Sequence, residues 1–240
     1  MGDNARHADV LSGPGHPPRT GLVLRTRQTR EGIERAPGPT TAPGDLMRLF
    51  VAIAPPPAVL DELDTWVEPF RATRHDLRWT DRAAWHVTLA FLGQVSEVAA
   101  ARLLPRLEHA AGQHPQIALA FAGAGAFPGA SRANVLWSGI SDDRGELARL
   151  AESVAVDADR AGVPLPDRGR AFQPHLTLAR CRTPADVTGL VAALDGYQGQ
   201  LWTADRLHLV RSRPGATDRV QRAAHPRYTS LASWPLKTTG

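Results

Sequence analysis

Two short segments of the chain repeat one pattern, a histidine followed two positions later by a threonine and then by a leucine. The copies are His86 with Thr88 and His175 with Thr177, each within an apolar run. Side chains two positions apart share one face of a β-strand, so each segment would present an imidazole beside a hydroxyl. Imidazoles exchange protons near neutral pH, and hydroxyls donate to oxygens where negative charge grows. Two such strands brought together would suit phosphoryl chemistry.

Three alternatives to this chemistry stay open. Either motif alone is also consistent with an ordinary strand that carries a half-buried structural histidine. A metal site on His86 and His175 would lack a nearby third ligand at ordinary spacing. A non-catalytic RNA-binding module is the third alternative, although binding alone does not require two imidazoles.

The pattern around the motifs predicts an α+β fold with antiparallel sheets. Helices and strands intermix, but the strands are short and lack the long apolar runs of a parallel sheet. A helix, a motif strand, a second helix and further strands follow one another roughly twice, which predicts two similar lobes. Strands are expected at 49–54, 77–79, 86–93, 117–121, 134–140, 201–210 and 228–234, with a motif strand at His175, helices after Pro57 and Ser96 and at 142–161 and 184–194, and a loop at 123–131.

Composition bounds the class of protein. The chain has 240 residues, 42% of them hydrophobic, and its single cysteine leaves no internal disulfide, which fits a reducing compartment. With no apolar run of membrane-spanning length and no secretory signal, we expect a cytoplasmic protein without membrane association. Residues 1–46 are rich in Gly, Pro and Arg and are expected to form a disordered extension, with the folded domain at 47–240 and a possible alternative start at Met47. The net charge of +4 permits an anionic ligand.

The motifs and their flanks resemble the 2H phosphoesterase superfamily, and within it the RNA 2′,3′-cyclic phosphodiesterases once called 2′-5′ RNA ligases. The resemblance spans about residues 47–236, and Trp85 departs from it because a smaller apolar residue is usual there. It implies a bilobal, pseudo-twofold structure whose lobes face a shared cleft. We also expect a monomer without a cofactor, and no metal, because a five-membered cyclic phosphate ester is already strained. The matching stretches are 47–53, 78–79, 86–93, 135–137 and 172–180, with the tail from 207–209 to Tyr228 and 234–236.

The same resemblance implies roles for the motif residues. His86 would be the proton donor to the leaving 3′-oxygen and His175 the proton acceptor that activates water, leaving a 2′-phosphate on RNA. Thr88 and Thr177 would bind the non-bridging phosphate oxygens. From spacing alone the two histidines are interchangeable. A small cyclic nucleotide or a 2′-5′ linkage is an alternative substrate.

Three further residues are candidates for substrate binding. Arg180 shares a strand face with Leu178 by simple alternation, but could face phosphate where the strand ends, or be a solvated arginine. Arg132 precedes the strand expected at 134–140 and is a candidate for contact with RNA. Phe172 could stack on a base or belong to the core.

Overall fold

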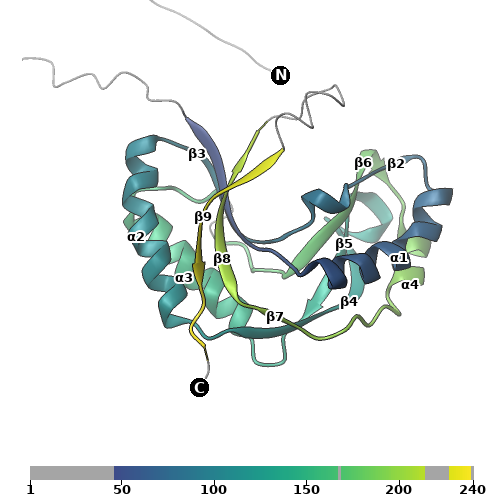
Figure 1. Cartoon of the computed structure of the whole chain (residues 1–240). Coiled ribbons are helices and arrows are strands. Elements are labelled where there is room, and N and C mark those ends of the chain that lie inside the picture. Colours follow the sequence, from purple (N-terminus) through teal and green to yellow (C-terminus); the bar gives the residue numbers. More distant parts are fainter. Residues whose placement is uncertain (1–45, 167–168, 214–226, 239–240) are drawn as a thin grey trace, which may run out of the picture. The chain divides into compact units, whose positions relative to one another are not determined.

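The computed structural model describes residues 46–166, 169–213 and 227–238, so residues 1–45 of the expected extension lie outside the described part. The predicted α+β class with antiparallel strands is confirmed (Figure 1). The elements in chain order are β1 (Met47–Ile53), α1 (Pro57–Thr73), β2 (Leu77–Trp79), the 3-10 turn η1 (Arg82–Ala84), β3 (Val87–Val95), α2 (Glu97–Gln113), β4 (Ile117–Phe127), the 3-10 turn η2 (Ala130–Arg132), β5 (Ala133–Ser141), α3 (Glu146–Arg160), β6 (His175–Ala185), α4 (Thr188–Leu194), β7 (Trp202–Ala204), β8 (Arg206–Ser212) and β9 (Tyr228–Pro235).

The strands form one antiparallel arrangement with the motif strands at its centre. The order is β7-β4-β5-β6-β3-β1-β8-β9, and β2 pairs with β6 outside this path. One set of four strands is therefore β7-β4-β5-β6, and the other is β3-β1-β8-β9. The two sets join where Val87 of β3 pairs with Leu176 of β6.

The order of elements repeats, as the sequence predicted. The run β1-α1-β3-α2-β4 is followed by the run β5-α3-β6-α4-β8. The last strand of each run crosses to the other set, because β4 lies beside β5 and β8 lies beside β1. The two sets are therefore interlocked, and each contains strands from both runs.

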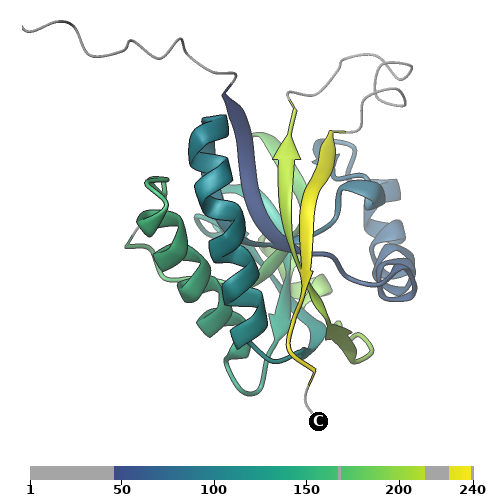
Figure 2. The same cartoon turned by 60° about the vertical axis from the view of Figure 1, so that its left-hand side comes forward.

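Two pairs of helices cover the two sets of strands. Helices α2 and α3 pack against each other, with α3 on β3 and α2 on β8 and β9 (Figure 2). Side chains of α1 and α4 meet those of β4 to β6 around Leu63, Val67, Leu178 and Leu194. These residues and the buried faces of α2 and α3 belong to one continuous core. Burial of each such side chain contributes roughly 1.5–3 kcal/mol.

Local signals set the ends of the helices. The Ser96 side chain caps α2 by accepting a hydrogen bond from the amide of Ala99 at 3.2 Å. Asp142 similarly accepts from the amide of Leu147 at the start of α3, at 2.7 Å. Gly162 has φ +79° just after α3, a conformation that favours glycine and ends helices. The predicted cap of α2 and the predicted end of α3 are therefore confirmed, whereas α3 begins at Glu146, four residues after the predicted start at 142, with Gly145 at its N-cap position.

Three further predicted boundaries are wrong. The segment 123–131 was expected to be a loop, but β4 continues to Phe127, because Gly125 leaves space for the Trp137 ring against its backbone. The predicted helix at 184–194 begins only at Thr188, because β6 continues to Ala185. The predicted strand at 201–210 is divided into β7 and β8.

Gly139 gives a test of the packing beside the motif strand β6. It pairs with His175, and a Cβ at this position would lie 2.5 Å from the carbonyl oxygen of Ala122. We expect Gly139→Ala to lower the free energy of unfolding by about 1–3 kcal/mol, measured by urea denaturation. Gly189→Ala is the control, because no atom lies within 4 Å of its added Cβ and α4 should gain or keep stability. Equal losses in the two variants would contradict a steric role for Gly139.

Candidate active site

The central strand pair determines which side chains face away from the core. Val87 and Leu176 lie opposite each other, and each is 0% exposed within the main core. Their sequence neighbours must point to the other face, because side chains alternate along a strand. That other face carries all four histidine and threonine side chains of the two motifs, and we call it the motif face.

The register brings the two motifs together on the motif face. When the pairing of Val87 with Leu176 is continued by one residue in each direction, His86 lies opposite Thr177 and Thr88 lies opposite His175. Directly opposite side chains in antiparallel strands lie close together. All four are only partly buried. The fold therefore groups two imidazoles and two hydroxyls, as the repeated pattern predicted they would be if the strands met.

Both imidazoles are held in the same way. Nδ1 of His86 lies 2.8 Å from the carbonyl oxygen of Ala84, and Nδ1 of His175 lies 2.7 Å from that of Gln173. A carbonyl oxygen can only accept, so Nδ1 donates its proton in both rings. The neutral ring then has a free lone pair on Nε2. Each histidine can take or give a proton at that atom.

Aromatic side chains enclose each imidazole, and the sequence analysis missed all of them. Phe50 and Tyr228 lie 4.6 Å and 5.0 Å from the ring centre of His86. Phe127 lies 5.0 Å from the ring centre of His175, and Trp137 lies 6.1 Å away. These partners come from other strands, β1 and β9 for His86 and β4 and β5 for His175, so no spacing along the chain indicates them.

Burial lowers the pKa of both imidazoles. For His86 it lowers the pKa from 6.5 to about 4, although the Ala84 carbonyl acts in the opposite direction. Burial is also the main cause of the lowered pKa of His175. The positive charge of Arg180 lowers the pKa of both rings further. Both imidazoles are therefore mostly neutral at pH 7 in the unliganded protein.

A β-bulge puts Arg180 on the motif face. Thr177 pairs with Trp137 and Arg180 pairs with Val135, two positions along β5, so Leu178 is an extra residue in β6. Simple alternation, which placed Arg180 on the face of Leu178, is therefore wrong. The exposed Arg180 instead shares the face of Thr177, where its charge acts on both imidazoles.

A similar bulge in β3 gives Phe91 the corresponding place. Thr88 pairs with Ala52 and Phe91 pairs with Phe50, so β3 also contains an extra residue just after its threonine. Phe91 is 44% exposed, and its ring lies 6.2 Å from that of Phe50. The two motif strands therefore carry an aromatic ring and a cation at equivalent positions.

The remaining sequence candidates lie elsewhere. Arg132 is an exposed residue at the end of η2, and no contact within the described residues joins it to the motif histidines. Phe172 is half-buried and packs against the main core, which fits the core role considered for it. Trp85, the departure from the family pattern, is 5% exposed and belongs to the same core.

Comparison with known proteins identifies the family. The family model described as the 2′-5′ RNA ligase superfamily matches residues 55–216. The chain belongs to this superfamily. Its resemblance to 2H phosphoesterases, seen first in the two motifs, is thereby confirmed.

Curated relatives and a solved structure agree with this assignment. The chain is 31% identical over 208 residues to an RNA 2′,3′-cyclic phosphodiesterase of Thermus thermophilus, covering 80% of this chain and 91% of the relative. An enzyme of the same name from Aquifex aeolicus is 30% identical over 106 residues, which cover 44% of this chain and 56% of the relative. The crystal structure of Escherichia coli LigT complexed with 3′-AMP has a TM-score of 0.62 and 26% identity, covering 80% of this chain and 99% of that one.

Two further features concern the described part of this superfamily member. No helix within it is long and apolar enough to cross a membrane. Among the same residues, no three His, Cys, Asp or Glu side chains are grouped as metal ligands.

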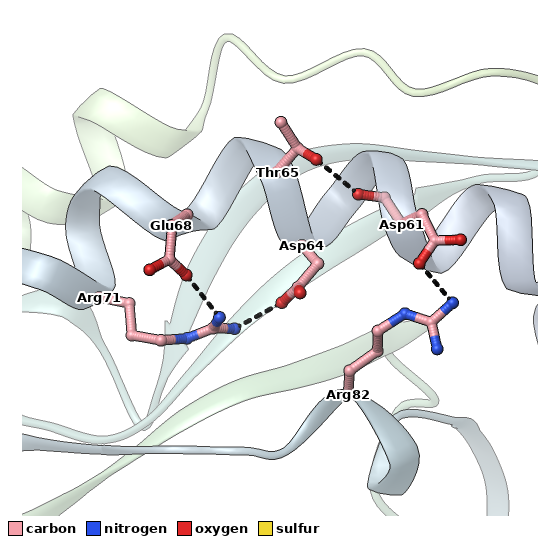
Figure 3. A network of polar contacts seen from close by, with 6 residues as sticks. All are labelled: Asp61, Asp64, Thr65, Glu68, Arg71 and Arg82. Carbon is pink, nitrogen blue, oxygen red and sulfur yellow. Dashed lines mark hydrogen bonds and ion pairs between the residues drawn. The ribbon is translucent and has the colours of Figure 1, made fainter.

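Arg82 anchors the turn that holds His86, and Figure 3 shows the ion pair of Arg82 with Asp61. The carbonyl that accepts from His86 belongs to Ala84, the last residue of η1. Arg82, the first residue of η1, forms an ion pair with Asp61 of α1 and donates to the carbonyl of Pro57 at 2.9 Å. This link between η1 and α1 makes Arg82 a positioning residue for the imidazole.

Loss of this anchor should be visible in the titration of His86. In Arg82→Gln, η1 should loosen and water should reach the ring, so the pKa of His86 should rise from about 4 towards 6.5. An NMR titration of the imidazole protons measures this, and Arg82→Lys should restore part of the shift. Asp64→Asn is the control, because Asp64 pairs with Arg71 of α1 and not with η1. An unchanged pKa in Arg82→Gln, or an equal rise in the control, would contradict the positioning role.

The lowered pKa of His86 also predicts how stability depends on pH. Between pH 6.5 and 4 the unfolded chain binds more protons than the folded chain, so stability is full above pH 6.5 and falls as the pH drops. A pKa of about 4 against an ordinary 6.5 corresponds to roughly 3 kcal/mol lost by pH 4. Urea unfolding between pH 4 and 6.5 should show that the free energy of unfolding depends less on pH in His86→Asn than in the unaltered protein. His75→Asn, at an exposed position, should keep the original dependence, and an equal dependence in all three proteins would refute the prediction.

Proposed function

We propose that the protein hydrolyses 2′,3′-cyclic phosphate ends of RNA to 2′-phosphates. The observation that carries this proposal is the grouping of two imidazoles on the motif face, each with Nδ1 bound to a carbonyl and Nε2 free. The chain's membership of the superfamily, and the name shared by its relatives in Thermus thermophilus and Aquifex aeolicus, also support it.

The reaction requires two proton transfers on opposite sides of phosphorus. A water oxygen forms a bond to phosphorus while the bond from phosphorus to the ribose 3′-oxygen breaks. In our proposal Nε2 of His175 takes the proton from water, and Nε2 of His86 gives a proton to the departing 3′-oxygen. Each transfer typically contributes about 10²–10⁴-fold to the rate.

The negative charge that grows on the non-bridging phosphate oxygens must be stabilised by hydrogen-bond donors. We assign this part to the hydroxyls of Thr88 and Thr177 and to the guanidinium of Arg180, which the bulge in β6 puts on the motif face. Phe91, at the equivalent position of β3, offers an exposed ring on which a base can stack.

The pKa values of the unliganded site alone would favour the opposite roles, with His86 as the base and His175 as the acid. Burial lowers the pKa of His86 to about 4, so at neutral pH this ring rarely carries a proton to donate before substrate binds. A bound cyclic phosphate brings a negative charge that favours protonation of either ring. We therefore keep the roles that the family resemblance implies, and a substrate with an activated leaving group decides between them.

A small cyclic nucleotide is the second candidate substrate. One observation favours it: a cation at Arg180 and an exposed ring at Phe91 can between them contact one phosphate and one base. Parallel assays with 2′,3′-cyclic AMP and with an RNA oligonucleotide ending in a cyclic phosphate distinguish the two, because an RNA enzyme should prefer the oligonucleotide in kcat/KM.

Substitution of each histidine tests the proposal. We expect His86→Ala and His175→Ala each to lower turnover by roughly 10²-fold or more, with a 2′-phosphate as the product of the unaltered protein. Activity should persist in EDTA. A cyclic phosphate diester with an activated leaving group needs little protonation, so it should rescue His86→Ala much more than His175→Ala.

Other outcomes have clear meanings. Preferential rescue of His175→Ala would reverse the two roles, and equal rescue of both would refute a division between acid and base. Loss of activity in EDTA with recovery on addition of zinc would refute the metal-free mechanism. A product carrying a 3′-phosphate would refute the assigned leaving group. Thr88→Ala and Thr177→Ala serve as matched variants on the motif face and should have smaller effects.

A further inference from the structure

A hollow of about 510 Å³ lies between α2 and α3, away from the motif face. It is lined by Arg102, Pro105, Arg106 and His109 of α2 and by Asp157 and Arg160 of α3. The buried sides of both helices share the main core with Val87, so the helices cover the face of β3 opposite the imidazoles. Figure 2 shows the two helices side by side. The hollow is therefore a separate feature of the surface.

The lining of the hollow is strongly positive. Three arginines face one carboxylate, which leaves an excess of two positive charges. Nη1 of Arg106 lies 3.9 Å from Oδ1 of Asp157, and Nη1 of Arg160 lies 3.7 Å from the same atom. Both separations exceed hydrogen-bond distance, so Asp157 attracts these guanidinium groups without using their N–H donors. Arg102 forms no hydrogen bond or ion pair with the rest of the described chain.

A purely structural role does not account for this set of charges. Asp157 is 8% exposed at the helix interface, and one arginine would suffice to neutralise it. Instead, one carboxylate fixes an arginine from each helix on either side of an open space. Guanidinium groups with free donors match the oxygens of phosphate in geometry and charge. The lining contains no Phe, Tyr or Trp side chain, although these residues are the typical anchors of protein interfaces.

We propose that this hollow binds phosphate groups of the RNA backbone, away from the end that enters the site. The choice of RNA as the phosphate source rests on the proposed function. The hollow would hold the strand by charge without reading its sequence, because backbone contacts carry affinity and base contacts carry specificity. It would therefore strengthen the binding of long RNA and leave the chemistry of a single nucleotide unchanged.

Direct binding of an unreactive RNA tests the proposal. The probe is a labelled single strand of about 20 nucleotides ending in a 3′-hydroxyl, followed by fluorescence anisotropy over a salt series. In the double variant Arg102→Gln/Arg160→Gln, loss of two phosphate contacts should reduce the slope of log K against log salt by about 1.4 and weaken binding roughly 25-fold near 0.1 M salt. Both side chains are exposed, so thermal unfolding should show that the fold is retained.

Arg144→Gln is the matched control. Arg144 is exposed on the turn before α3, whose first residue, Glu146, lies about 21 Å along the helix axis from Arg160 at 1.5 Å per residue. Its removal costs one positive charge outside the hollow and should change the affinity and the salt slope much less. If each lost charge weakens RNA binding equally in the control and the double variant, net charge alone explains the effect and the proposal is overturned. Unchanged RNA binding in the double variant would also overturn it.

Two further measurements separate this proposal from neighbouring ones. One outcome is that pyrophosphate binds the wild type but not the double variant, while RNA binds both equally. This outcome would indicate a site for small phosphate ligands and overturn the RNA assignment. Turnover of 2′,3′-cyclic AMP should be equal in the wild type and the double variant. If the wild type does not hydrolyse this compound or the cyclic-ended oligonucleotide, the proposed function fails, while the anisotropy result still tests the hollow.

Discussion

The burial of Val87 and Leu176 against each other is the constraint on which the candidate site depends. These residues join the two sets of strands and are 0% exposed. Because side chains alternate along each strand, burial of this pair forces the adjacent histidines and threonines onto the motif face. A slip of one residue would turn the imidazoles into the core and the apolar side chains outward. The cost of exposing these side chains thus fixes the register, and the register fixes the grouping of the catalytic candidates.

The same packing makes the stability of the fold sensitive to protonation at the site. Aromatic rings around His86 exclude water and lower its pKa to about 4, so protonation of this ring opposes folding. The carbonyl of Ala84 partly offsets the effect, and it also leaves Nε2 as the reactive atom. The ring is therefore held by one directed hydrogen bond in an otherwise apolar environment. That arrangement suits a group that must receive or release a proton only when an anion lies next to it.

Much of this arrangement could be predicted from the sequence, and the parts that could not share a physical reason. The face shared by His86 and Thr88 follows from the period of a strand, and the cap at Ser96 follows from local hydrogen bonding. The bulge at Leu178 gives no signal in a run that alternates regularly, because it arises from pairing with β5. The ring of Phe127 beside His175 and the link from Arg82 to Asp61 also come from distant segments. Local signals predicted local structure, whereas the surroundings of the imidazoles depend on tertiary contacts.

The two motifs are nearly equivalent, so any difference in the roles of their histidines must come from their neighbours. The bulges in β3 and β6 follow the threonine at the same point and turn the third residue after it onto the motif face. That residue is Phe91 in one strand and Arg180 in the other. A ring cannot neutralise phosphate charge and a lone guanidinium offers a smaller stacking surface, so a nucleotide bound as we propose would have one favourable orientation across the pair. In the proposed reaction, an oriented substrate would place its leaving oxygen nearer one imidazole and its attacking water nearer the other. The asymmetry that acid–base catalysis needs can thus come from two positions outside the repeated motif.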